Sequence, residues 1–184
     1  MSDRTRHELS RTDFAAYFAS EARLHWTIAA GHAGRDLADD VVQDAAMIAL
    51  SKLSTFTVGT NLRAWFAQIV TNVARNQRRK RAKNAAEPLE GLAAPQLDGH
   101  VPVDAHGSLR ADQVAFDDQV LEALEGLAPD ARAVLLLRVV HELPYGEIAR
   151  TLQMPENTAM SHVHRAREFL RTKLAPTHCS KVTR

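Results

Sequence analysis

The fold of the C-terminal part is decided by Pro144-Tyr145-Gly146-Glu147-Ile148-Ala149-Arg150-Thr151-Leu152, which a short turn joins to Thr158-Ala159-Met160-Ser161-His162-Val163-His164-Arg165-Ala166-Arg167. The first segment predicts a short helix with Ile148 and Ala149 on its buried side, and Ala149 is small enough for two helix backbones to approach closely. A short helix, a tight turn and a longer helix are typical of a helix-turn-helix unit, whose second helix enters the major groove of DNA. An ordinary helical hairpin gives the same pattern.

Apolar residues at three- and four-residue spacing predict further helices on both sides of this unit. They are, in chain order, a helix through Phe14 that Gly31 and Gly34 break, a helix capped by Asp36 that runs to about Leu53, a helix from Thr60 or Asn61 into the basic run 75–81, the helix 114–124, and a helix with Pro129 in its first turn. The last long helix is expected over 158–174. No alternating pattern typical of a strand stands out, so the predicted fold class is all-α.

A stretch without periodicity separates two groups of predicted helices. Between residues 87 and 107, prolines and glycines are scattered with no regular spacing, which is typical of a flexible linker. We therefore expect two small helical domains, residues 10–84 and 113–175, joined by a linker over 85–112. A disordered tail is expected over 176–184.

Composition narrows the classes of protein that the chain can represent. A single cysteine, Cys179, occurs in 184 residues, which leaves no intrachain disulfide and no cysteine cluster for zinc. Residues 1–10 are polar and charged, unlike a signal peptide. No run approaches the roughly 20 apolar residues that span a membrane. The sequence predicts a cytoplasmic protein without membrane insertion.

Charge is strongly segregated in the N-terminal half. Four aspartates crowd one predicted helix: Asp36, Asp39, Asp40 and Asp44. No acidic residue occurs from Ala45 to Ala86, a stretch that carries Lys52, Arg63, Arg75, Arg78, Arg79, Lys80, Arg81 and Lys83. The pattern predicts that one surface meets phosphates while another meets a basic protein. A solvated helix end favoured by the helix dipole explains the basic run equally well.

Nothing in the sequence is typical of a catalytic or metal site. His162 and His164 are two residues apart, so they point in different directions on a helix. We find neither a glycine-rich phosphate loop nor a nucleophile elbow. Aspartates on a helix surface, such as Asp39 and Asp40, are far more often solvated or interfacial than catalytic. We expect no catalytic residue, no metal and no cofactor.

Taken together, the motifs resemble the extracytoplasmic-function (ECF, group 4) sigma factors of the bacterial sigma-70 family. The resemblance covers about residues 14–83 and 113–174, and each motif alone is weak to moderate. It is carried by Asp39-Asp40-Val41-Val42-Gln43-Asp44, by Phe56-Thr57-Val58-Gly59-Thr60-Asn61-Leu62-Arg63-Ala64-Trp65-Phe66, by Leu127-Ala128-Pro129, by Tyr145-Gly146-Glu147-Ile148-Ala149 and by His164-Arg165-Ala166-Arg167. Their order and spacing make the combination specific.

The resemblance implies roles for three groups of residues. Docking on the β′ clamp helices of core RNA polymerase is implied for Asp39, Asp40, Gln43 and Asp44. Recognition and opening of the minus-ten promoter element, with a base pocket in the loop 55–61, is implied for Thr57, Asn61, Arg63, Asn72, Arg75, Asn76 and Arg79. Contact with the minus-thirty-five element is implied for Thr158, Ser161, His162, Arg165 and Arg167.

The implied function is that of a sigma factor, a subunit without enzymatic activity. Its implied partners are core RNA polymerase, through the β′ clamp helices and the β flap, promoter DNA, and an anti-sigma factor that controls it. The chain departs from the family at Met160 and His162, where a basic residue is usual.

Three other hypotheses about the function remain open. A sigma-like mimic would sequester an anti-sigma factor without driving transcription, and Met160 and His162 point weakly that way, whereas the basic run 75–83 points against it. A plain helix-turn-helix repressor leaves the acidic helix unexplained. An enzyme has the least support.

Overall fold

The computed structural model describes residues 9–86 and 118–175, and these residues form helices without any strand. The elements are α1 (Arg11–Ala33), η1 (Arg35–Leu37), α2 (Ala38–Ser51), η2 (Leu53–Thr55), α3 (Leu62–Ala86), α4 (Asp118–Glu125), α5 (Pro129–Val140), α6 (Tyr145–Leu152) and α7 (Glu156–Leu174). The predicted all-α class is confirmed. The predicted tail at 176–184 and all but the first two residues of the predicted linker lie outside the described residues.

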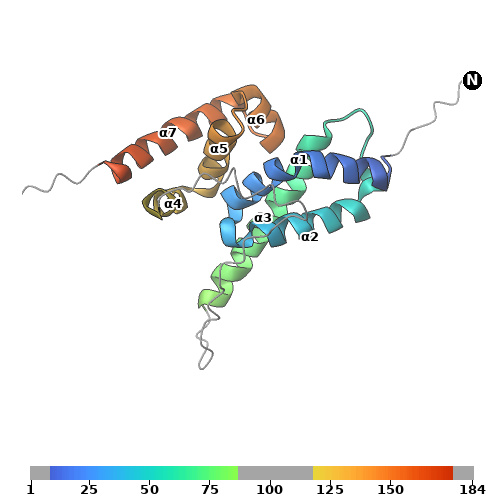
Figure 1. Ribbon diagram of the computed structural model, residues 1–184, viewed down its shortest axis with the longest axis horizontal. Coiled ribbons are helices and arrows are strands. Elements are labelled where there is room, and N and C mark those ends of the chain that lie inside the picture. Colours follow the sequence, from blue (N-terminus) through green and yellow to red (C-terminus); the bar gives the residue numbers. More distant parts are fainter. Residues whose placement is uncertain (1–8, 87–117, 176–184) are drawn as a thin grey trace, which may run out of the picture.

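The helices form two groups that lie against each other (Figure 1). Helices α1, α2 and α3 make the N-terminal half, and α4 to α7 make the C-terminal half. Helix α1 packs against α2 and α3 on its own side and against α5 of the other half, while α3 also contacts α6. The last turns of α3 project beyond both groups (Figure 1). Contact between the halves was not anticipated from the sequence.

At the helix ends of the N-terminal half, the predicted break at Gly34 is confirmed, whereas the break at Gly31 and the cap by Asp36 are wrong. Helix α1 begins with a capping box between Ser10 and Asp13, but it continues through Gly31 and ends only at Gly34, whose φ of 100° suits glycine. Helix α2 has Leu37 as its N-cap residue and no side-chain cap, so Asp36 does not cap it. Asp36 lies in η1 and instead forms an ion pair with Arg81 of α3.

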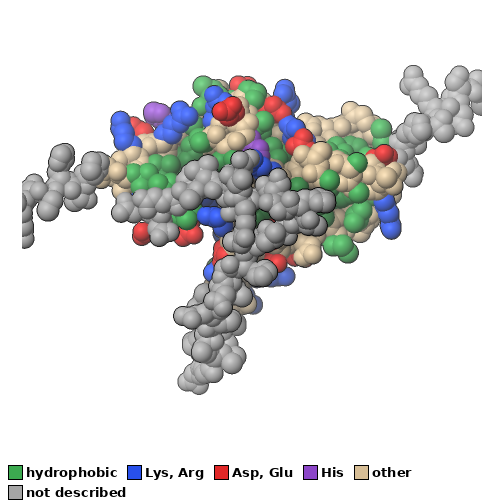
Figure 2. Space-filling model, in the orientation of Figure 1, with side chains coloured by type: hydrophobic (Ala, Val, Ile, Leu, Met, Phe, Trp, Pro, Cys, Tyr) green, Lys and Arg blue, Asp and Glu red, His purple; other side chains and the backbone are tan. Residues whose placement is uncertain are grey.

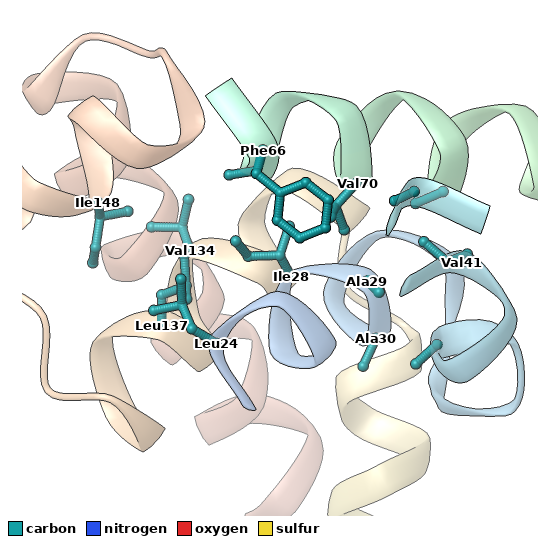
Figure 3. Packing of buried hydrophobic residues seen from close by; sticks show 14 of the residues in the cluster. Leu24, Ile28, Ala29, Ala30, Val41, Phe66, Val70, Val134, Leu137 and Ile148 are labelled. Carbon is teal, nitrogen blue, oxygen red and sulfur yellow. The ribbon is translucent and has the colours of Figure 1, made fainter. Parts of the chain in front are cut away.

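Phe66 of α3 is the centre of the N-terminal core. Its buried ring makes edge contacts with Phe14, with 5.3 Å between the ring centroids, and with His25, at 4.5 Å. Such T-shaped pairs add to the free energy gained from apolar burial. Phe66 lies directly beside Ile28 of α1 (Figure 3), so the aromatic cluster ties α1 to α3.

The C-terminal half contains the predicted helix-turn-helix. Helix α6 follows Pro144, and Gln153, in the left-handed conformation with φ of 52°, ends it before α7. Ile148 of α6 and Val163 of α7 are buried in the angle between the two helices. Helix α5 supports this pair and starts, as predicted, with Pro129 in its first turn.

One hydrophobic cluster runs through both halves. Leu24 of α1 meets Val134 and Leu137 of α5 in its centre (Figure 3). At Gly31 the two backbones approach so closely that an added Cβ would lie 2.5 Å from the Cα of Ala133. The close approach therefore requires glycine at position 31, because a larger residue would separate α1 from α5. This requirement outweighs the low helix propensity of glycine.

Two histidines are buried in α1. Burial lowers the pKa of His25 to about 3, helped by the positive charge of Arg63. Burial also lowers the pKa of His32 to about 4, although the nearby carboxylate of Asp130 acts in the opposite direction. Both side chains are therefore neutral in the folded protein at neutral pH. Each must acquire a proton when the chain unfolds below its ordinary pKa.

We expect the free energy of unfolding to fall as the pH drops below 6.5. The lowered pKa values mean that the unfolded chain binds more protons than the folded chain, so the loss begins near 6.5 and continues toward the folded-state values. Between pH 6.5 and 5 the expected loss is about 2 kcal/mol for each histidine. Urea unfolding at several pH values measures it. A His32→Gln variant should show a shallower dependence, and the exposed control His164→Gln should match the wild type.

Candidate nucleic-acid interface and acidic docking face

The four residues predicted to dock on polymerase lie together on α2. Asp39, Asp40, Gln43 and Asp44 are all exposed, because Val41 and Ala45 turn the opposite side of the helix into the core. Asp39 and Asp40 lie in the first turn, where the positive end of the helix dipole favours carboxylates. We call these four residues the acidic face.

Two apolar residues extend the acidic face by one helical turn. Met47 is 66% exposed and Ile48 is 36% exposed. They follow Gln43 and Asp44 at four-residue spacing, so they continue the same surface. Sequence reasoning missed them, since apolar residues of an amphipathic helix are expected inside. Acidic side chains beside an apolar patch suit a protein partner with a basic, partly apolar surface.

Neighbouring helices hold two aspartates of the acidic face in place. The indole Nε1 of Trp26 donates to Asp39 Oδ1 over 3.0 Å, and Gln77 Nε2 donates to Asp44 Oδ2 over 2.9 Å. The side chain of Asp40 has no hydrogen bond or ion pair with any other described residue. The spacing of residues in the sequence carried no signal for these two contacts, because Trp26 and Gln77 come from α1 and α3.

The loop between η2 and α3 presents the candidate base pocket. Gly59 has a φ of 92° and has no atom near the position of a Cβ, so the loop is open at its tip. Thr57 and Val58 are exposed there, while Phe56 packs on Trp65 with 5.3 Å between the ring centroids. Asn61 Oδ1 accepts the backbone N–H of Ala64, which caps the start of α3. Thr57 is therefore exposed to solvent, whereas Asn61 has a structural role.

The predicted minus-ten residues of α3 separate into two sets. Asn72, Asn76 and Arg79 are exposed at intervals of four and three residues, so they form one continuous stripe on the helix. Arg75 is also exposed but forms an ion pair, and the half-buried Arg63 forms two. Arg75 pairs with Asp130 of α5 over 3.1 Å.

Arg63 is the most constrained of these cations. Its guanidinium donates to Glu21 over 2.6 Å and forms a second ion pair with Glu147 of α6. Burial alone would lower the pKa of Arg63, but the hydrogen bond to Glu21 and the two carboxylates outweigh it and raise the pKa. Arg63 thus stays charged and is neutralised within the protein.

On α7, the predicted minus-thirty-five residues differ in accessibility. Ser161, Arg165 and Arg167 are exposed, whereas Thr158 and His162 are half-buried. Ser161 donates to the carbonyl of Asn157, and Arg165 donates to the carbonyl of Ser161. Basic and histidine side chains gather along the outer edge of the C-terminal half, over α7 (Figure 2).

A shallow hollow of about 430 Å³ lies where α6 meets the first turns of α7. It is lined by Tyr145, Met160, Ser161, Val163, His164 and Arg167. Met160 is 47% exposed, so an apolar side chain stands where a basic residue was expected from the resemblance.

Within residues 9–86 and 118–175 there is no cluster of three acidic, histidine or cysteine side chains arranged to hold a metal ion. None of the described helices has the length and apolar character to cross a membrane.

Comparison with known proteins matches both halves. Residues 17–84 match the family model for sigma-70 region 2, and residues 117–170 match the model for sigma-70 region 4. The first interval contains the acidic face and the α3 stripe. The second contains the helix-turn-helix.

Relatives and solved structures agree with this match. The chain is 32% identical over 135 residues to the ECF RNA polymerase sigma factor EcfG of Rhodopseudomonas palustris, an alignment that spans 73% of this chain and 70% of the relative. It is 26% identical to the ECF sigma factor SigW of Bacillus subtilis over 74% and 75% of the two chains.

Among solved structures, the sigma factor RpoE of Bartonella quintana, in complex with the anti-sigma factor NepR, is 26% identical. It matches with a TM-score of 0.63 over 90% of this chain and 99% of its own. CnrH, in complex with the cytosolic domain of CnrY, has a TM-score of 0.57 at 20% identity over 89% and 88% of the two chains, and shows the shared fold. The chain belongs to the extracytoplasmic-function sigma factors of the sigma-70 family.

Proposed function

We propose that the chain binds core RNA polymerase and directs it to promoters by recognising minus-ten and minus-thirty-five elements. The observation that carries the proposal is the pairing of two surfaces on adjacent helices. The acidic face of α2, with Met47 and Ile48, is exposed beside α3, which has no acidic residue and presents Asn72, Asn76 and Arg79. A polymerase and an opened DNA strand can then be held by one small domain.

The minus-ten step follows from the geometry of the N-terminal half. A base is read only after it leaves the stack, at a cost of a few kcal/mol. The open tip of the loop at Thr57 and Gly59 offers space for such a base. Phosphate contacts from Arg79 and its basic neighbours would offset the cost by releasing counterions. No cofactor enters this scheme, and the protein acts as a binding subunit of the transcribing enzyme.

The minus-thirty-five step is assigned to the start of α7. Arg165 and Arg167 are exposed further along, in the middle of α7, and can reach phosphates or the acceptor edge of guanine. Met160 offers only apolar contact, for example to a thymine methyl group. We infer that this half contributes less electrostatic affinity than the N-terminal half and mainly sets the position of the protein on duplex DNA.

Control by an anti-sigma factor completes the proposal. The sigma factor RpoE of Bartonella quintana, which is 26% identical to this chain, was solved in complex with the anti-sigma factor NepR. The hollow between α6 and α7, which has apolar and basic lining residues, supports a protein contact on the C-terminal half. The β flap of the polymerase is proposed to bind the C-terminal half as well. The proposed location of the protein is the cytoplasm, where polymerase works.

A second candidate function is that of a mimic that binds an anti-sigma factor without starting transcription. The exposed Met160 and the half-buried His162 favour it, because they reduce the cationic character of the helix that reads duplex DNA. The exposed stripe of α3 favours the sigma factor.

Reconstitution with core RNA polymerase separates the two functions. The protein and polymerase are incubated with genomic promoter fragments, and transcript ends are mapped. We expect transcripts that start at defined positions only when the protein is present. Polymerase binding without any such transcript would support the mimic instead.

Reversing charge on the acidic face should abolish polymerase binding. We expect Asp40→Lys with Asp44→Lys to weaken binding at least a hundredfold, because two attractive contacts become repulsive. Binding to immobilised core polymerase measures the effect. The control is Glu122→Lys with Glu168→Lys, which makes the same change in net charge at exposed sites of the C-terminal half. Equal binding by both double variants would contradict the assignment of the face.

Removing one cation of the α3 stripe should weaken binding to opened promoter DNA. For Arg79→Ala in complex with polymerase, we expect several-fold weaker binding to a forked minus-ten DNA. The slope of log affinity against log salt concentration should decrease by about 1 for the lost phosphate contact. Arg171→Ala, in the last turn of α7, is the control and should leave the slope unchanged. An unchanged slope for Arg79→Ala would exclude a phosphate contact there.

A further inference from the structure

A hollow lined by charged side chains lies where the end of α1 and η1 meet α3, α4 and α5. Its volume is about 540 Å³, and its lining includes Gly34, Arg35, Asp36, Arg81, Glu125 and Arg132. None of these residues belongs to the acidic face, to the stripe of α3 or to the helix-turn-helix, so the contacts proposed for polymerase and promoter DNA do not account for the hollow. Pockets that bind small molecules typically measure about 300–1,000 Å³, so the hollow has room for such a ligand.

Arg132 brings a nearly buried cation to this hollow. It is 9% exposed, and its Nε donates to the carbonyl of Gly31 over 2.7 Å. No described residue accepts a hydrogen bond from its two Nη groups. Burial lowers the pKa of Arg132 against the opposing charge of Glu125, yet a guanidinium keeps its proton in proteins. Its unused N–H groups therefore favour an anionic acceptor within the hollow.

Positive charge exceeds negative charge around the hollow. Arg81 forms an ion pair with Asp36, so these two charges compensate each other. Arg35 is exposed and has no ion pair within the described part of the chain. Arg78, whose charge helps to lower the pKa of Arg132, is also exposed and pairs with none of the described carboxylates. An anion that enters the hollow therefore meets arginines whose charge is not already neutralised.

Glu125 indicates that the anion also carries hydrogen-bond donors. An ionised carboxylate can only accept hydrogen bonds, and it repels a bare phosphate or pyrophosphate. A nucleoside presents N–H and O–H donors that a carboxylate can accept, while its phosphates present acceptors to guanidinium groups. A nucleotide therefore satisfies both kinds of lining residue, whereas an inorganic anion satisfies one.

We propose that the hollow is a binding site for a nucleoside diphosphate or triphosphate. Arg35 and Arg132 hold the phosphates, because a planar guanidinium forms paired hydrogen bonds with phosphate oxygens, and Arg78 adds attraction from beside the site. Glu125 accepts a donor of the base or the ribose. The ligand contacts elements of both halves, and its binding needs neither polymerase nor promoter DNA. The inference goes beyond the proposed function, so each can fail while the other holds.

Titration calorimetry of the full chain tests the class of ligand. The probes are adenosine diphosphate, guanosine diphosphate, pyrophosphate and inorganic phosphate. We expect at least one nucleotide to bind about tenfold more tightly than pyrophosphate, because only a nucleoside can donate to Glu125. In Glu125→Gln this preference should become smaller, and pyrophosphate should bind more tightly than it binds to the wild type, since a repelling charge is lost.

Two exposed arginines test the location of the site. The test variant is Arg35→Gln with Arg78→Gln, and the matched control is Arg150→Gln with Arg171→Gln, at exposed positions of α6 and α7. Both variants lose two positive charges. We expect the test variant to bind the nucleotide about tenfold more weakly and the control to stay within about twofold of the wild type, because salt screens distant exposed charges. Arg132 is kept, since its buried hydrogen bond joins α5 to α1.

The possible outcomes separate the proposal from simple attraction to a basic protein. Tighter binding of a nucleotide than of pyrophosphate, weakened in the test variant and kept in the control, supports the site. No binding of either nucleotide, an equal loss in both double variants, or pyrophosphate binding that matches the nucleotide overturns it. Displacement of the nucleotide by single-stranded DNA at the same concentration of phosphate groups assigns the hollow to DNA and also overturns it. Far-ultraviolet circular dichroism checks that each variant keeps its helices.

Discussion

The close approach of α1 and α5 at Gly31 is the constraint on which the arrangement of the whole structure depends. Because Gly31 has no side chain, its carbonyl can receive the buried guanidinium of Arg132 while Leu24 reaches Leu137. Burial lowers the pKa of Arg132, but a guanidinium keeps its charge, so a hydrogen-bond partner at this site is essential. The low helix propensity of glycine is thus the local cost of a contact that unites the two halves.

A second organising feature is the division of charge between α2 and α3. The two helices pack against each other, yet one carries the acidic face and the other carries the basic run. Side chains also join them: Asp44 of α2 accepts a hydrogen bond from the neutral amide of Gln77, and Asp36 of η1, just before α2, pairs with Arg81 of α3. These contacts orient both surfaces at once. A substitution in one helix that breaks such a contact is therefore expected to change the orientation of side chains on the other helix.

Sequence reasoning predicted the local elements well because helix periodicity and turn residues are local signals. It located α5 from Pro129 and α6 from Pro144, and it placed the acidic face on one helix. It failed where a distant partner decides the outcome. From the sequence, Gly31 is predicted to break the helix, because the contact with α5 that requires a glycine is not visible there. In the same way, Arg63 is predicted to be a free cation, because its partner Glu147 belongs to the other half of the chain. No spacing in the chain encodes those contacts.

The placement of the two tryptophans has a spectroscopic consequence. The indole of Trp26 is hydrogen-bonded to Asp39 in the acidic face, and that of Trp65 lies against Phe56 beside the candidate base pocket. The sequence contains two tryptophans in total, so each indole belongs to a different proposed contact surface. In variants that keep a single tryptophan, the fluorescence of Trp26 would report on polymerase docking, and the fluorescence of Trp65 would report on capture of the opened strand.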